Sequence, residues 1–250
     1  MIALEMDHLT KTFGALKATD DLSMSIGQGE LHAIIGPNGA GKTTLISQLS
    51  GQLTPSAGAI RFFGRDISRL SMPQRVGCGL VRSFQITSLC REFSALTNVA
   101  LAVQARAGHG FHFFANARDD PRFTRPAEQA LLRVGLGDRA GVPAGQLAHG
   151  EQRQLELAIA LAMEPKVLLL DEPMAGMGAE ESQGVIALLR ALKGKYTILL
   201  VEHDMDAVFA LADRISVLVY GRCIATGAPA EIRGNPLVHE AYLGEEVIHA

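Results

Sequence analysis

Residues 31–43 read Leu31-His32-Ala33-Ile34-Ile35-Gly36-Pro37-Asn38-Gly39-Ala40-Gly41-Lys42-Thr43. The run that ends at Ile35 is apolar and too short for a core helix, so it predicts a buried strand. The residues that follow fit G-x-x-x-x-G-K-[ST] at every fixed position. A helix is then expected from Lys42 to Ser50, ended by Gly51. This stretch predicts a strand, a phosphate-binding loop and a helix, which together form the first unit of an α/β fold.

The residue types in this loop suit a nucleotide with several phosphates. Glycines allow successive backbone N–H groups to turn toward one anion, and a helix that begins near Lys42 directs the positive end of its dipole at that anion. The Lys42 ammonium can reach the β and γ phosphates, and the Thr43 hydroxyl can ligate Mg²⁺. We therefore predict ATP and Mg²⁺ as ligands. The predicted ATP-binding residues of the loop are Asn38, Gly39, Ala40, Gly41, Lys42, Thr43 and Thr44.

Beyond the loop, short apolar runs alternate with helical patterns. The continuous run Val167 to Leu170 is typical of a strand covered on both faces of a parallel sheet. Alternation of this kind predicts an α/β sheet. Further strands are predicted at 59–63, 197–201 and 215–219, and helices at 179–193 and 204–212.

The middle of the chain breaks this pattern. Between Thr87 and Met163 the signals are helical only, at residues 95–105, 127–134 and 151–163, which predicts a helical subdomain inserted into the α/β core. The predicted division is 1–86 for the first part of the nucleotide-binding core, 87–162 for the helical subdomain, and 163–250 for the second part with a short tail. The segment 107–125 gathers Phe111, Phe113, Phe114 and Phe123. We interpret this cluster as local packing, with a docking surface as the alternative.

Composition narrows the class of protein. The chain has 250 residues, of which 48% are hydrophobic and 20% charged, as in an ordinary globular protein. A net charge of −3 gives no reason to expect nucleic acid as a partner. Cys78, Cys90 and Cys223 are scattered, so we expect buried or half-buried thiols in place of a disulfide scaffold or zinc site. No signal peptide and no membrane-spanning run of ~18 apolar residues is expected.

Polar residues follow several of the predicted strands. Asp171 ends a strand that we expect beside the loop strand, where its carboxylate can hold Mg²⁺ directly or through water. Glu172 is placed to polarise an attacking water as a general base. Because phosphoryl transfer depends on positioning and charge neutralisation, Gln85 and His203 are further candidates. Each of these two alone fits an exposed glutamine or a loop histidine equally well.

Taken in order, these motifs resemble the ATP-binding cassette (ABC) transporter ATPases. The diagnostic element of that family is a signature before a helix, commonly Leu-Ser-Gly-Gly-Gln, and here Leu147-Ala148-His149-Gly150-Glu151-Gln152-Arg153 stands upstream of Asp171. The likeness covers essentially the whole chain. It implies a P-loop NTPase (RecA-like) core with an N-terminal β subdomain and an inserted α-helical subdomain, and ATP hydrolysis coupled to transmembrane transport.

The resemblance also implies roles for individual residues. Phe13 would stack on adenine, with a core phenylalanine as the alternative interpretation. Glu172 would be the catalytic base, with Lys42, Gln85 and His203 as further catalytic residues, and Gln85 would also relay the nucleotide state to the helical subdomain. Mg²⁺ would be held by Thr43, Gln85 and Asp171. The signature residues Ala148, His149, Gly150 and Glu151 would complete the ATP site of an opposing subunit.

Within the family, the chain most resembles the ATPases of branched-chain amino acid importers. This likeness rests on residues 79–85, the segment 107–125, Glu202-His203-Asp204-Met205 and the tail 236–245. Importers of urea, amides or aromatic acids and a lipopolysaccharide exporter remain alternatives. Two positions depart from the family pattern: Ala148 replaces the signature serine, and Gly178 stands where an aspartate is usual. They keep open a non-hydrolysing, ATP-dependent interaction module.

The resemblance implies partners and a location as well. The expected partners are transmembrane permease subunits, a second ATPase subunit (the same chain or a sister cassette) and a periplasmic or extracellular solute-binding protein. The expected location is the cytoplasmic face of the inner or plasma membrane, with attachment through the permease subunits. A soluble ABC ATPase that acts on ribosomes or DNA is disfavoured, because the chain has one cassette and no basic patch.

Overall fold

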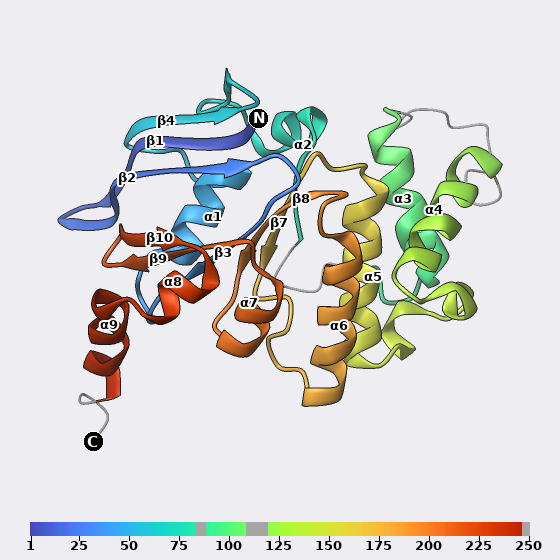
Figure 1. Cartoon of the computed structure of the whole chain (residues 1–250). Helices are drawn as coiled ribbons and strands as arrows, with labels where there is room; N and C mark the ends of the chain where they lie inside the picture. The colour runs from blue at the N-terminus through green and yellow to red at the C-terminus, as the bar shows by residue number, and fades with distance from the viewer. Residues whose placement is uncertain (84–88, 109–119, 247–250) are drawn as a thin grey trace.

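The computed structural model of the chain describes residues 1–83, 89–108 and 120–246. Figure 1 shows two sheets, with helix α1 (Lys42–Ser50) between them, and a helical lobe to one side. The larger sheet has the strand order β10-β9-β3-β8-β7-β6, and the smaller has the order β2-β1-β4-β5. The fold predicted from the sequence, an α/β core with an N-terminal β subdomain and inserted helices, is confirmed.

The inner strands β3, β7 and β8 of the six-stranded sheet are buried on both faces. In this sheet, strands β6, β7, β8, β3 and β9 run parallel, and β10 pairs antiparallel with β9. Alternate residues of one strand point to opposite faces: Val167 and Leu169 pack in the core with α1 and the smaller sheet, whereas Leu168 and Leu170 pack with the helices of the other face. The bounds are β3 Leu31–Ile35, β6 Leu80–Arg82, β7 Val167–Asp171, β8 Thr197–Val201, β9 Arg214–Val219 and β10 Arg222–Gly227.

The strand order corrects one prediction. We expected the strand that ends in Asp171 beside the loop strand β3, but β8 lies between β3 and β7. Here the chain leaves β3, forms β6 and β7 at the far edge, and returns to fill the central position with β8.

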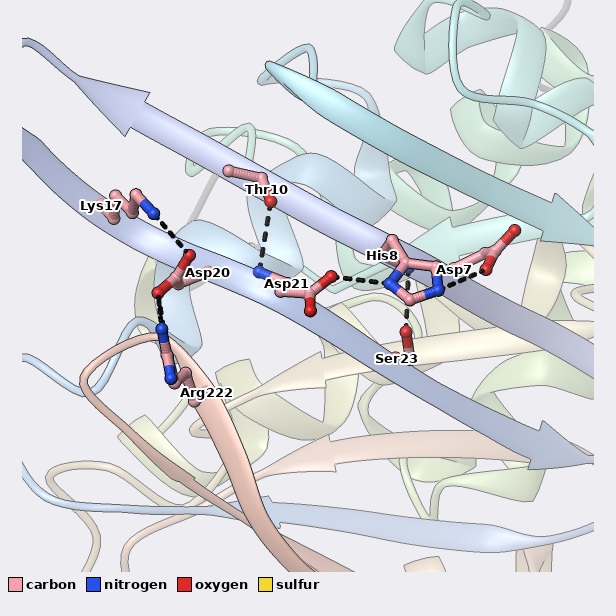
Figure 2. Close-up of polar contacts among 8 residues, drawn as sticks. All are labelled: Asp7, His8, Thr10, Lys17, Asp20, Asp21, Ser23 and Arg222. Atoms are coloured by element: carbon pink, nitrogen blue, oxygen red, sulfur yellow. Dashed lines mark hydrogen bonds and ion pairs between the residues drawn. The ribbon is translucent and has the colours of Figure 1, made fainter.

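The smaller sheet contains the longest strands, β1 (Ile2–Phe13) and β2 (Leu16–Gly27), with β4 (Ala57–Phe62) and β5 (Arg65–Asp66). Strands β1 and β2 pair antiparallel with several register shifts. His8 and Asp21 adopt left-handed backbone angles at these irregularities, with φ of 50° and 55°. Figure 2 shows their side chains in contact across the two strands, with His8 Nδ1 2.6 Å from Asp21 Oδ1.

The helical lobe is inserted between β6 and β7. Its helices are α3 (Ala95–Arg106), α4 (Pro121–Arg133) and α5 (His149–Ala162), with short 3₁₀ turns at Gly137–Arg139 and Ala144–Gln146. Ser94 and Asp120 cap the first two helices through their side-chain oxygens. Phe123 is buried in the lobe, so local packing is the correct interpretation for that residue. Phe111, Phe113 and Phe114 lie outside the described residues.

The remaining helices are α2 (Met72–Cys78), α6 (Ala179–Leu192), α7 (Met205–Leu211), α8 (Pro229–Arg233) and α9 (Pro236–Glu246). Among the described residues, no helix combines the length and apolar character needed to cross a membrane. The three cysteines are free thiols, as expected, although Cys90 is exposed where burial was predicted.

Candidate nucleotide-binding site

The carboxyl ends of the parallel strands β3, β8 and β7 meet at one edge of the larger sheet. The register aligns Ile34 of β3 and Asp171 of β7 with Val201 of β8. The backbone N–H of Glu172 donates to the Val201 carbonyl oxygen at 2.9 Å, which fixes the turn that follows β7. The phosphate loop, the Asp171-Glu172 pair and the segment that carries His203 therefore emerge at the same edge, as the sequence predicted.

Backbone atoms of β9 and β2 lie close to the glycines of the phosphate loop. A Cβ at Gly36 would stand 2.1 Å from the backbone oxygen of Leu218 in β9, and one at Gly41 would stand 2.2 Å from the backbone oxygen of Ala18 in β2. Gly41 also has φ +98°, a conformation that side chains disfavour. Glycine at these positions is therefore required by the neighbouring backbone.

A backbone chain of hydrogen bonds holds the loop between the two sheets. The N–H of Gly221, in the β9–β10 turn, donates to the Ala40 carbonyl at 2.9 Å, and the N–H of Asp20 donates to the Gly221 carbonyl at 2.9 Å. Figure 2 shows the Asp20 carboxylate between the Arg222 guanidinium, with bonds of 2.6 and 2.8 Å, and the Lys17 ammonium at 3.0 Å. These two cations hold the pKa of Asp20 below its usual value. The loop is thus joined to β2 of the smaller sheet.

The cation and the helix end needed for phosphate binding are in place. Lys42 is buried, and its Nζ donates to the carbonyl oxygens of Gly36 and Pro37 in the loop. Helix α1 begins after Gly41 without a side-chain cap, so its first backbone N–H groups are not covered by a capping side chain. An anion at the loop would meet these N–H groups, the helix dipole and the ammonium together.

Asp171 has a partner that the sequence did not reveal. Its Oδ2 accepts from the Arg82 guanidinium at 2.7 Å, and the two side chains are 1% and 8% exposed. Arg82 stands at the end of β6, beside β7. A charged residue in an otherwise apolar strand was the available signal, because a buried arginine requires a counter-charge.

The predicted magnesium residues are compatible with that ion. Thr43 is exposed in the first turn of α1, and Asp171 provides a carboxylate at the same sheet edge. Hydroxyl and carboxylate oxygens suit Mg²⁺, which keeps several waters and binds few protein ligands. In the described part of the chain, no three histidines, cysteines or acidic residues gather in a way that could hold a metal. Gln85 lies outside the described residues.

The loops that carry Glu172 and His203 are joined through a buried residue, Glu202. Glu172 has φ 48°, a left-handed conformation that costs a non-glycine residue free energy and is common at functional sites. The Glu202 carboxylate accepts from the N–H of Met174 at 3.0 Å and of His203 at 3.1 Å. Burial raises the pKa of Glu202 although these hydrogen bonds act in the opposite direction. The loops after β7 and β8 are thereby tied together, while the His203 side chain is 64% exposed.

The signature residues lie at the start of α5, in the helical lobe. Ala148 is the N-cap residue, and its N–H is bound by Glu151, which also pairs with Arg139 at 2.9 Å. Glu181 of α6 accepts from the N–H of Gly150 at 3.3 Å and from the N–H of Gly178 at 3.2 Å. Glu181 therefore links the signature residue Gly150 to Gly178, one of the two positions that depart from the family pattern.

Phe13 ends β1 with its side chain 48% exposed, and the Lys11 ammonium lies 5.2 Å from the ring centroid. The structure therefore contradicts the alternative of a core phenylalanine, and the ring is accessible for stacking.

A cavity of about 260 Å³ opens between the core and the helical lobe. Most of its lining is apolar, and Arg82 and Ser83 lie on the side toward the strand ends. The lining includes Met72 and Val76 of α2, Leu89, Ala102 of α3, and Ile159 and Met163 at the end of α5.

Comparison with protein-family models gives two matches. The model of the ABC transporter family matches residues 19–175. The model of the branched-chain amino acid ATP-binding cassette transporter matches residues 222–248.

Whole-chain comparisons agree with these matches. The chain is 38% identical to the high-affinity branched-chain amino acid transport ATP-binding protein LivG of Salmonella typhimurium, and 38% identical to the protein of the same description, BraF, of Pseudomonas aeruginosa. Each alignment covers 97% of this chain and 98% of the relative. Among solved structures, the ADP conformation of an ATP-binding cassette of an ABC transporter matches with a TM-score of 0.87 and 29% identity. That match covers 98% of this chain and 99% of the other.

Proposed function

The chain belongs to the ABC transporter family of ATP-binding cassettes, and from this premise we propose that it is the ATP-hydrolysing subunit of an importer of branched-chain amino acids. The observation that carries the proposal is the convergence of the phosphate loop, Asp171-Glu172 and His203 on one sheet edge. The solute rests on relatives that are 38% identical over nearly their full length and are described as branched-chain amino acid transport proteins.

In this proposal, each residue of the site has a separate role in phosphoryl transfer. Loop N–H groups and the Lys42 ammonium bind the phosphates, and the half-exposed ring of Phe13 stacks on the base. Thr43, Asp171 and Gln85 would hold Mg²⁺, which when bound would supply positive charge at the phosphate oxygens. The Glu172 carboxylate accepts a proton from the attacking water. His203 contacts the γ-phosphate.

A second subunit completes the site in this proposal. The N-terminal end of α5, with Ala148, His149, Gly150 and Glu151, faces the nucleotide of the opposing copy or of a sister cassette. Backbone N–H groups at that helix end suit a phosphate. ATP therefore favours the closed pair because it contacts both subunits in that state and one subunit in the open state.

The membrane partner follows from the same proposal. The cavity between α2, α3 and α5 has an apolar lining and joins the core to the helical lobe, which suits a short helical segment of a permease subunit. Docking there holds the chain at the cytoplasmic face of the membrane. In the complete importer, a solute-binding protein outside the membrane delivers the amino acid.

Glu172→Gln tests the catalytic assignment. The variant should bind ATP with wild-type affinity, release no phosphate and accumulate as an ATP-bound dimer, because the amide cannot accept the proton. Phosphate release and size-exclusion chromatography with ATP measure both properties. Glu180→Gln is the matched control, since Glu180 is exposed in the first turn of α6 and should leave turnover unchanged. Wild-type turnover in Glu172→Gln would remove Glu172 as the base.

The solute is tested separately by reconstituting the ATPase with its permease and binding protein in vesicles. ATP-dependent uptake of radiolabelled leucine or isoleucine, with urea and phenylalanine as comparisons, distinguishes this importer from its relatives. Uptake of urea or phenylalanine without leucine or isoleucine would refute the proposed solute.

A further inference from the structure

Arg82 is a buried cation placed directly against the carboxylate of Asp171. Its side chain is 8% exposed, that of Asp171 is 1% exposed, and the guanidinium lies 2.7 Å from Oδ2. Two charges removed from water in this way are tolerated when each satisfies the other. Loss of either partner leaves an uncompensated charge in a dry environment, so the pair is strongly interdependent.

A second nitrogen of the guanidinium, Nη1, is held at the end of the helix that follows the phosphate loop, whereas Nε is buried without a hydrogen-bond partner. Arg82 Nη1 donates to Gln52 Oε1 at 2.5 Å and lies 3.4 Å from the hydroxyl oxygens of Ser47 and Ser50. These residues lie in or just after the last turn of α1. Arg82 therefore connects β6, the end of α1 and Asp171 at one point.

The same side chain lines the cavity between core and lobe. Arg82 and Ser83 contribute to its wall together with Val76 and Met163. Arg82 thus pairs with the carboxylate assigned to the metal and also lines the surface assigned to the permease.

The charge of Arg82 opposes that of a metal at Asp171. Like charges a few ångströms apart repel strongly where water is excluded, and salt screens buried charges poorly. A guanidinium that stayed on Oδ2 would weaken the binding of a divalent cation to the same carboxylate. Loss of the guanidinium would strengthen it.

We propose that Arg82 is a positioning residue that acts as the counter-ion of Asp171 in the nucleotide-free state and gives up this carboxylate when Mg²⁺ and nucleotide bind. The inference rests on the proposed function, which assigns Asp171 to the metal. Arg82 holds the Asp171 carboxylate in place before the metal arrives. Arg82 also lines the cavity. When it leaves Asp171, the binding of the metal therefore changes the permease-binding surface.

The test measures metal dependence of nucleotide binding and needs no turnover. A fluorescent ADP analogue is titrated into wild-type protein and variants at increasing MgCl₂, and in EDTA. In Arg82→Gln the Mg²⁺ concentration that gives half of the affinity gain should fall by about tenfold or more, because the repelling charge is gone. Arg61→Gln is the control: Arg61 forms an exposed ion pair with Asp7 at 2.9 Å and should respond as the wild type does.

Two further variants keep the test decisive if Arg82→Gln is poorly folded. Arg82→Lys retains the charge, so its half-saturating Mg²⁺ should stay within about twofold of wild type. Asp171→Asn with Arg82→Gln leaves neither charge buried and should fold, with no greater Mg²⁺ response than Asp171→Asn alone. An unchanged or higher Mg²⁺ requirement in Arg82→Gln, or a tenfold shift in Arg82→Lys, would overturn the counter-ion role. Absence of ATP hydrolysis by the wild type would instead refute the proposed function.

Discussion

Replacing Gly41 by alanine should separate the two reasons for a glycine in the phosphate loop. At φ +98° an alanine is strained by about 1–2 kcal/mol. Its Cβ would also stand 2.2 Å from the backbone oxygen of Ala18, so β2 or the loop must shift. Overpacking against backbone adds about 1–3 kcal/mol. Gly39 is the matched control, because it has φ +77° and no atom within 4 Å of its added Cβ.

Thermal denaturation without nucleotide measures the difference between the two variants. Gly39→Ala should lose about 1–2 kcal/mol through strain alone. Gly41→Ala should melt a further 2–12 °C lower, roughly, from the added contact at about 2–4 °C per kcal/mol. Equal melting temperatures within about 1 °C would refute the reasoning. Backbone strain would then account for the whole loss of stability, and the contact with the Ala18 oxygen would contribute nothing.

Three other predictions concern stability. Asp21 raises the pKa of exposed His8 above its ordinary 6.5, so the contribution of this pair is complete below pH 6.5 and lost as pH rises through the folded-state pKa. Between about pH 6 and about pH 9, the melting temperature of His8→Gln should change less with pH than that of the wild type. The same pH dependence in both proteins would contradict this prediction. Leu200→Ala empties a fully buried position in β8, so it should lower the free energy of unfolding in urea by about 2–5 kcal/mol. Leu132 is 67% exposed, so Leu132→Ala should change this free energy by less than about 0.5 kcal/mol. Glu181→Ala removes hydrogen bonds to two helix starts and should cost about 0.5–1.5 kcal/mol in the same assay, so an unchanged midpoint would contradict the contact.

The parts of the fold that follow from local pattern were predicted closely. Strands β3 and β8 and helix α1 have the bounds that their apolar runs and flanking glycines indicated. Strands β1 and β2 were not delimited, because polar residues and left-handed positions at His8 and Asp21 interrupt their alternation. The central position of β8 was missed because strand order depends on how distant segments pack, which no local pattern records.

Some residues of the site were likewise predicted from local pattern, and others were not. Asp171 and Glu172 follow a recognisable strand, so their place at the sheet edge was predicted. The partner of Asp171 was not, since Arg82 lies 89 residues earlier and the helical lobe separates the two in sequence. The contact between Glu181 and Gly150 likewise joins two helices whose approach depends on the packing of that lobe. Gln85 remains a prediction.

The hydrogen bonds that hold the phosphate loop between the two sheets have a consequence for evolutionary drift. The N–H of Gly221 binds the Ala40 carbonyl and the N–H of Asp20 binds the Gly221 carbonyl, so both bonds join main-chain atoms. Nearly every residue type carries those atoms, and substitutions along the turn leave them in place. The side chain of Tyr220 is 85% exposed, so its φ of 47° is what limits substitution there, whereas a Cβ at Gly221 would stand 2.8 Å from the Ala18 oxygen. Homologous cassettes can exchange most side chains around the loop and still inherit its position.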